Sequence, residues 1–253
     1  MKKRTKKSIR VATKVFSRVL LAVVLCAIMY VSMQFISVGI FGDEVGYRII
    51  QEEKDGSAHY VPELEYHYKE NETSTVRLDL DLPDNQVAEP IIEASKTTQI
   101  VMNVVAQILM LVVLGIFPYN ILWQFGNRDD TNVRYKGQRP DPYRGIKIGF
   151  LAMIPFALFW LLLVIARFTD WNNYYQFFNL FNSPFMPFNN WVLGTFESLS
   201  NIALWRFFLL LPTLLFVPIV SGIAYRMGGN HFSLAEFITF KNKKDTDEGE
   251  EEI

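Results

Sequence analysis

The chain has 253 residues, of which 50% are hydrophobic, and its 25 Lys and Arg against 26 Asp and Glu leave a net charge of −1. The apolar residues form long blocks instead of being dispersed, which excludes an ordinary soluble domain and indicates membrane spans. A single cysteine, Cys26, excludes an intramolecular disulfide bond.

The first segment combines charge with an apolar run. Residues 1–18 carry eight Lys or Arg and no acid, and the 24 residues of Val19–Gly42 that follow carry no charge. A signal peptide has the same order of basic and apolar residues. This run, however, is too long for the apolar region of a signal peptide, and no A-x-A-like cleavage site follows it. A bacterial lipoprotein cleavage site needs a small residue before its cysteine, whereas Leu25 precedes Cys26. We predict a basic cytoplasmic N-terminus over 1–18 and an uncleaved transmembrane helix over 19–41.

A polar segment follows over residues 42–96. Residues 43–96 contain fourteen acids and five bases. Short segments of it have strand-like patterns, and the Asp55-Gly56 turn signal separates the first two: Gly46–Gln51, Ala58–Val61, Leu64–Tyr68 and Thr75–Leu82. We expect a small antiparallel sheet of three or four strands. A core of this size is marginally stable alone, so we expect the sheet to be stabilised by the membrane helices or by a partner.

Histidines in the polar segment resemble a metal cluster. His59 and His67 stand at even spacing with two glutamates between them, Glu63 and Glu65. Pro62 is expected to interrupt that strand, and mixed His and Glu on an acidic sheet are commonly solvated surface, so no metal site is predicted.

Three more spans are expected, at 99–125, 148–168 and 202–225. The loop between the first two, 126–147, is short and basic, with six bases and three acids over 128–147. Prolines within the spans predict kinks rather than breaks: Pro118, Pro155, Pro212 and Pro218. Gly145 and Gly149 give a single match to G-x-x-x-G, a motif of close helix packing.

The segment 169–201 between the last two spans is aromatic and rich in amides. Residues 168–196 hold eleven Phe, Tyr or Trp and six Asn, and Trp171–Trp191 has no charge. This composition suits a membrane–water interface. Prolines divide the segment, so we predict two interfacial helices, Trp171–Phe181 and Phe188–Ser198, that lie flat against the outer leaflet.

The C-terminal part is expected to stay outside the membrane. Ser233 and Glu236 fit a capping box, which predicts an amphipathic surface helix within a cytoplasmic segment over 226–244. The acidic residues 245–253 predict a disordered tail.

Charge sets the expected orientation. The side with both termini and the middle loop has eighteen bases, and the other side has five. This bias predicts a multi-pass protein of the cell membrane with both termini cytoplasmic. The fold class is therefore an all-α membrane protein: a four-helix transmembrane bundle with a small extracytoplasmic β insertion and interfacial helices, typical of a bacterial inner membrane.

Two groups of residues are candidate sites. Arg167 and Arg206 lie near the outer membrane level, where the nearest acids are Asp170 and Glu197. They form either an anion or lipid-headgroup site or structural ion pairs that fix the aromatic segment, and the structural interpretation is favoured. The second group is Gln34, Asn103 and Gln107. These side chains either line a path for a solute or, as favoured here, form interhelical hydrogen bonds.

Catalytic chemistry has no support in the sequence. No nucleophile, metal or phosphate-loop motif is present, and no Asp, Glu or His lies within a span. We predict no enzyme, no catalytic residue and no cofactor, and the basic N-terminus indicates anionic lipid rather than nucleic acid. The favoured function is a non-enzymatic envelope interaction or accessory protein, whose partners are the lipid bilayer and another membrane or envelope protein. The alternative is a small-solute or lipid transporter subunit, and an outer-face lipid-modifying enzyme comes third.

Overall fold

The structure is a computed structural model that describes residues 2–52, 58–68, 86–137, 141–169, 171–194 and 198–232. The predicted strand Thr75–Leu82, the amphipathic helix after Ser233 and the acidic tail lie outside these residues. The remaining predictions can be compared with the described elements.

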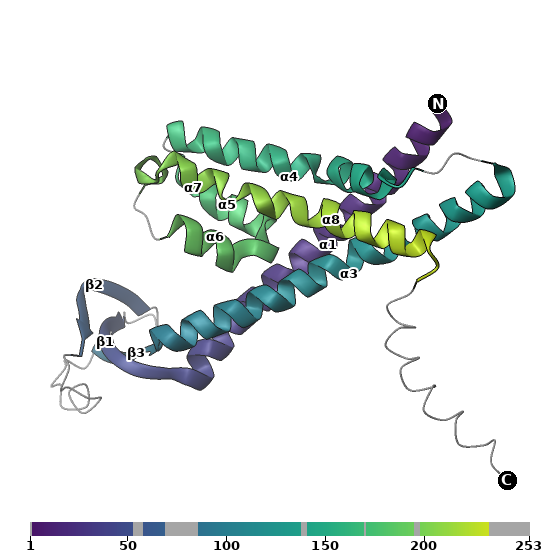
Figure 1. Ribbon diagram of the computed structural model, residues 1–253. Coiled ribbons are helices and arrows are strands. Elements are labelled where there is room, and N and C mark those ends of the chain that lie inside the picture. The colour runs from purple at the N-terminus through teal and green to yellow at the C-terminus, as the bar shows by residue number, and fades with distance from the viewer. Residues whose placement is uncertain are drawn as a thin grey trace, which may run out of the picture. The chain divides into compact units, whose positions relative to one another are not determined.

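Four helices are long and apolar enough to cross a membrane, as the sequence predicts. They are α1 (Lys2–Phe41), α3 (Lys96–Lys136), α4 (Arg144–Phe168), and α7 (Leu204–Phe208) with α8 (Leu211–Gly229), which together count as one span (Figure 1). At 1.5 Å per residue, α1 is about 60 Å long, twice the thickness of a hydrocarbon core. The basic N-terminus and the first part of the predicted loop 126–147 are therefore continuous helix.

The fourth span is interrupted near its start. α7 ends at Phe208 and α8 begins at Leu211, with Pro212 at the first turn of α8. Proline is tolerated there because its missing N–H would have no helical partner. Pro218 lies inside α8 without ending it, so only Pro212 marks the interruption.

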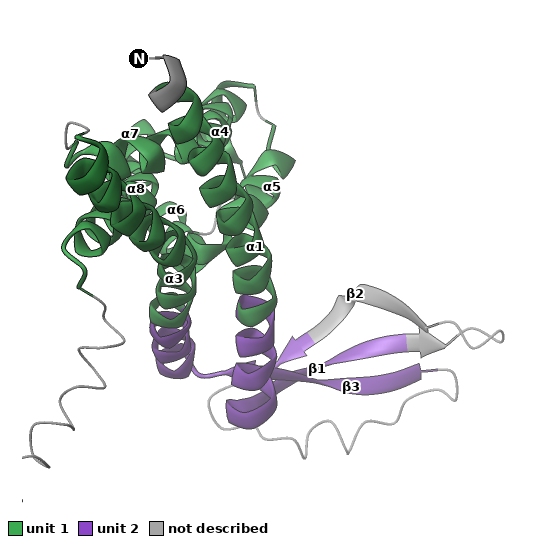
Figure 2. Cartoon of the chain, turned by 90° about the vertical axis from the view of Figure 1, so that its right-hand side faces the viewer, with its two compact units in different colours: residues 1–29, 107–253 green, residues 30–106 purple. Residues whose placement is uncertain are grey.

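The chain divides into two compact units (Figure 2). Unit 1 is residues 1–29 and 107–253, and unit 2 is residues 30–106. Unit 2 holds a three-stranded antiparallel sheet in the order β2-β1-β3. Its strands are β1 (Gly42–Glu52), β2 (Ala58–His67) and β3 (Gln86–Ala94).

Two strand predictions need correction. The predicted segments Ala58–Val61 and Leu64–Tyr68 fall in one strand, β2, except for Tyr68, which follows its end, so Pro62 does not end the strand. The register shifts between Arg48 and Ile50 of β1, opposite the stretch that contains Pro62. Proline is accommodated at such bulges because no ladder hydrogen bond is required there. β3 pairs along the other side of β1 and was not predicted as a strand.

Unit 1 contains closely packed helices. A Cβ atom at Gly149 of α4 would lie 2.6 Å from the Cα of Pro218 in α8, and one at Gly145 would lie 2.6 Å from the carbonyl oxygen of Ser221. Real Cβ atoms do not come this close, so both positions of the predicted G-x-x-x-G motif require glycine. The same contact buries Gly222 of α8 against Ile146.

Candidate functional site

The aromatic segment forms a helical hairpin in unit 1, and the turn of the hairpin is buried. It consists of α5 (Asn173–Phe181), the 3-10 turn η1 (Ser183–Phe185) and α6 (Met186–Leu193). Ser183 is fully buried, and its hydroxyl donates to the carbonyl oxygen of Val23 in α1 at 2.6 Å. The ring of Phe185 packs against Phe216, well inside α8. The segment thus holds two short helices, and the turn between them is buried among the helices of unit 1, while their orientation to a membrane stays a prediction.

The asparagines of this hairpin bond to one another. Asn189 donates to Asn179 at 3.1 Å, and Asn179 and the Tyr175 hydroxyl donate to Asn190 at 3.1 and 2.8 Å. Asn182 lies 3.5 Å from Asn189. Asn179, Asn182 and Asn189 are all buried. A buried amide is costly unless it is hydrogen-bonded, so this set accounts for four of the six asparagines in the apolar segment.

The glutamine and asparagine predicted on one face of α3 have different partners. The Gln107 amide donates to the carbonyl oxygen of Pro184 at 2.8 Å and accepts from the backbone N–H of Phe188 at 3.2 Å. Gln107 therefore holds the hairpin turn. Within unit 2, Gln34 donates to Asn103 at 3.1 Å. Both glutamines therefore have hydrogen-bond partners within the chain.

The two arginines predicted as an outer site bind backbone carbonyls. Arg167 Nε donates to Ile202 at 2.8 Å, and Arg206 Nη1 donates to Leu193, the last residue of α6, at 3.4 Å. Each guanidinium also lies over a neighbouring ring, Phe168 at 5.2 Å and Trp205 at 5.7 Å. A cation near a helix C-terminus is favourable, so these bonds fix segment ends. Asp170 and Glu197 lie outside the described residues.

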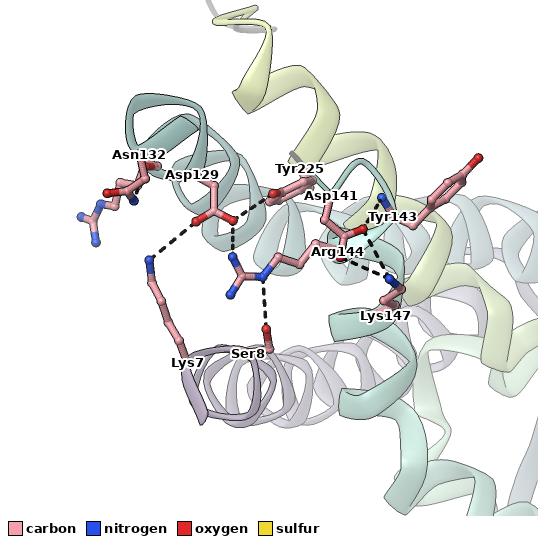
Figure 3. A network of polar contacts seen from close by, with 10 residues as sticks. Lys7, Ser8, Asp129, Asn132, Asp141, Tyr143, Arg144, Lys147 and Tyr225 are labelled. Carbon is pink, nitrogen blue, oxygen red and sulfur yellow. Dashed lines mark hydrogen bonds and ion pairs between the residues drawn. The ribbon is translucent and has the colours of Figure 1, made fainter. Parts of the chain in front are cut away.

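A second polar cluster, which the sequence did not indicate, lies in unit 1 at the other end of α4 from Arg167. The end of unit 1 that holds Arg144, the first residue of α4, is here named the basic end. Asp129 of α3 and Arg144 of α4 form an ion pair with both side chains buried (Figure 3). The Tyr225 hydroxyl donates to Asp129 at 2.9 Å, and Arg144 Nε donates to Ser8 at 3.1 Å. Lys7 Nζ lies 3.6 Å from the same carboxylate.

This cluster joins α1, α3, α4 and α8 through one carboxylate. The Arg144 guanidinium also lies over the ring of Phe125 at 4.9 Å, which covers the pair from the core side. A buried ion pair offsets its desolvation only when further hydrogen bonds satisfy both ions, and here Tyr225 and Ser8 supply them. The arrangement is a fixed cross-link between helices.

Metal chemistry has no candidate group in the described part of the chain, where no three His, Cys, Asp or Glu side chains converge. Comparison with protein-family models, with curated proteins and with solved structures finds no match for the chain.

Proposed function

We propose that the chain is a non-enzymatic membrane accessory protein whose unit 2 binds a partner protein. The observation that carries the proposal is the exposure of β3. Val87 and Ile92 of this strand are both 47% exposed. Exposed apolar side chains on a sheet edge are a common feature of protein-binding surfaces.

The pairing of β3 supports the same proposal. The buried hydrophobics among the strand residues whose side chains are described, 42–50, 66–67 and 86–94, are Tyr47, Ile49 and Ala94. A sheet of three strands needs a covered apolar face for independent stability. A partner strand or surface on β3 would supply it, since the described pairing of β3 is with β1 alone.

The sheet is joined to the helices without linkers. β1 begins at Gly42, the residue after the end of α1, and β3 ends at Ala94, two residues before α3 begins. The Gln99 side chain donates to the carbonyl oxygen of Ala94 at 2.8 Å, which fixes that junction. A partner held on this sheet would thus be held on the ends of two membrane helices.

The transporter alternative gains no support from the contacts. Arg167 and Arg206 bind carbonyls, and the hairpin amides bind one another. A solute site would need polar groups directed into an open cavity. We expect Arg206→Gln to leave thermal stability unresponsive to a solute screen, as in the wild type, and a solute-dependent shift that Arg206→Gln abolishes would favour the transporter instead.

Site-specific photocrosslinking in native membranes tests the partner. A photoreactive residue at Val87 or Ile92 should give one discrete adduct with a second membrane or envelope protein, which also co-purifies stoichiometrically in mild detergent. The matched control is Tyr135, which is 83% exposed on α3 in unit 1 and should give no such adduct. Equal adducts from all three positions, or none from β3, would remove the basis of the proposal.

We also propose that the protein lies in the cell membrane, in a bacterial inner membrane, with both termini cytoplasmic. The bias of eighteen bases against five supports this orientation. Cysteine labelling tests it, and the native Cys26 does not interfere because it is fully buried. Trp191→Cys should react from outside and Tyr135→Cys only after permeabilisation, since these side chains are 80% and 83% exposed. External labelling of Tyr135→Cys would reverse the topology.

A further inference from the structure

A groove between α1 and α3 at the basic end of unit 1 is lined by bases. Two adjoining hollows of about 490 and 390 Å³ share Val11, Lys14, Phe125 and Arg128. The other bases that line them are Lys7, Arg10 and Arg18. The four bases of α1 are spaced by three, four and four residues, so they share one helix face. No Asp or Glu is among the described residues that line either hollow.

Most of the positive charge in this groove has no partner among the acids that the structure describes. Arg10, Lys14, Arg18 and Arg128 form no ion pair with any acid that the structure describes. Other bases at this end do have acids: Arg144 pairs with Asp129, Lys147 with Asp141, and Arg134 with Asp130. Among the bases of the groove, Lys7 is the one that lies within ion-pair distance of a described acid, Asp129. Like charges gathered in this way repel unless an anion lies among them.

The groove also has an apolar floor at a defined membrane level. The apolar residues that line it, here called its floor, are Phe125, Val11 and Ile121, and Lys7 Nζ lies 5.1 Å from the centroid of the Phe125 ring. Arg18 is the last residue before the apolar run of α1, and Phe125 is the last residue of the apolar run of α3. The groove therefore lies where both helices leave the hydrocarbon, which is the level of lipid phosphates.

We propose that this groove binds the phosphate headgroup of an anionic phospholipid. The bases of α1 and Arg128 of α3 would surround the phosphate, while the floor of Phe125 and Val11 would contact the glycerol and the first acyl carbons. A basic pocket between membrane helices is the geometry that anionic headgroups require. The inference is independent of any partner on unit 2.

Native mass spectrometry of the full chain, released from nanodiscs of mixed phosphatidylglycerol and phosphatidylcholine, tests the site. We expect the wild type to retain phosphatidylglycerol in preference to phosphatidylcholine. Each base near an anionic surface contributes about a fivefold increase in affinity, so Lys14→Gln with Arg128→Gln should weaken retention about 25-fold. The matched control, Lys6→Gln with Lys136→Gln, removes one base from each of the same helices outside the groove and should retain the lipid.

Three results would overturn the proposal. Equal loss in the groove and control variants would mean nonspecific attraction to a charged surface. Equal retention of both lipids would mean that no headgroup site exists. Displacement of phosphatidylglycerol by millimolar inorganic phosphate alone would assign the groove to a free anion. Thermal unfolding in neutral detergent checks that the variants fold. If the variant Lys14→Gln with Arg128→Gln does not fold, Arg10→Gln with Arg18→Gln takes its place.

Discussion

The helix pairs α4–α8 and α1–α3 have similar apolar composition but pack differently. The most apolar 18-residue windows of α4 and α8 are 33% and 44% buried, while those of α1 and α3 are 22% and 17% buried. In α4 and α8, Gly149 and Gly145 allow backbone contact with Pro218 and Ser221. Lipid tails are as apolar as leucine, so hydrophobicity does not bring membrane helices together and small residues decide which pairs approach closely.

The α1 helix adds apolar side chains to the buried core of unit 1, and polar bonds also hold it at a few points. Ser8 accepts from Arg144 at one end, and the carbonyl of Val23 accepts from Ser183 farther along. The Cys26 thiol lies 3.6 Å from the carbonyl oxygen of Met110.

Asp129→Asn should have the largest effect, because it removes the charge that joins the loosely packed helices to the close pair. Arg144 would stay buried without a counter-ion, which costs about 3–5 kcal/mol. Thermal unfolding in detergent measures the loss. Asp130→Asn is the control, since its contacts with Arg134 and His231 are partly exposed and each is worth at most about 1 kcal/mol. The double change Asp129→Leu with Arg144→Leu should recover most of the stability, and a double variant as unstable as Asp129→Asn would contradict the ion-pair explanation.

Gly149→Leu tests whether close approach holds α4 and α8 together. The added side chain would overlap the backbone at Pro218, and such overpacking costs about 1–3 kcal/mol. We expect a value at the upper end and a lower unfolding midpoint. Gly39→Leu in α1 is the matched control, because no atom lies within 4 Å of a Cβ placed there. If both leucines had the same effect, packing would not distinguish the two pairs.

Gln107→Leu should loosen the hairpin from α3. The change leaves the carbonyl of Pro184 and the N–H of Phe188 without a side-chain partner, at a cost of about 1–2 kcal/mol. Faster proteolysis between α5 and α6, together with a lower unfolding midpoint, is the expected result. Asn173→Leu, at an exposed position of α5, should change neither. Identical behaviour of the two variants would show that the amide bonds do not hold the hairpin.

The sequence predicts features that depend on local composition. The four apolar runs give four helices, and Gly145 and Gly149 meet α8 as their spacing indicates. The sheet is also found where the polar segment 42–96 was expected to form one. Each of these results depends on patterns within a few residues, such as hydrophobic period and small-residue spacing.

Features that depend on distant partners were not predictable in the same way. Asp129 and Arg144 both fell in a segment read as a basic loop, and the Tyr225 that completes their cluster is 96 residues from Asp129. The depth of the hairpin depends on Ser183 meeting Val23, 160 residues away. Amide-rich composition suits both a membrane surface and a self-bonded buried turn, so it did not distinguish between them.

Gln34→Leu should have the smallest effect and defines how weakly α1 and α3 are joined in unit 2. The hydrogen bond from Gln34 to Asn103 is part-buried, and such bonds between membrane helices average about 0.6 kcal/mol. We expect a barely lowered unfolding midpoint, and Gln34→Leu with Asn103→Leu should be close to the wild type because no amide is left without its partner. A loss of stability as large as that of Gln107→Leu would mean that α1 and α3 depend on this hydrogen bond. The two helix pairs would then differ in what joins them, a hydrogen bond or close packing, and not in how strongly they are joined.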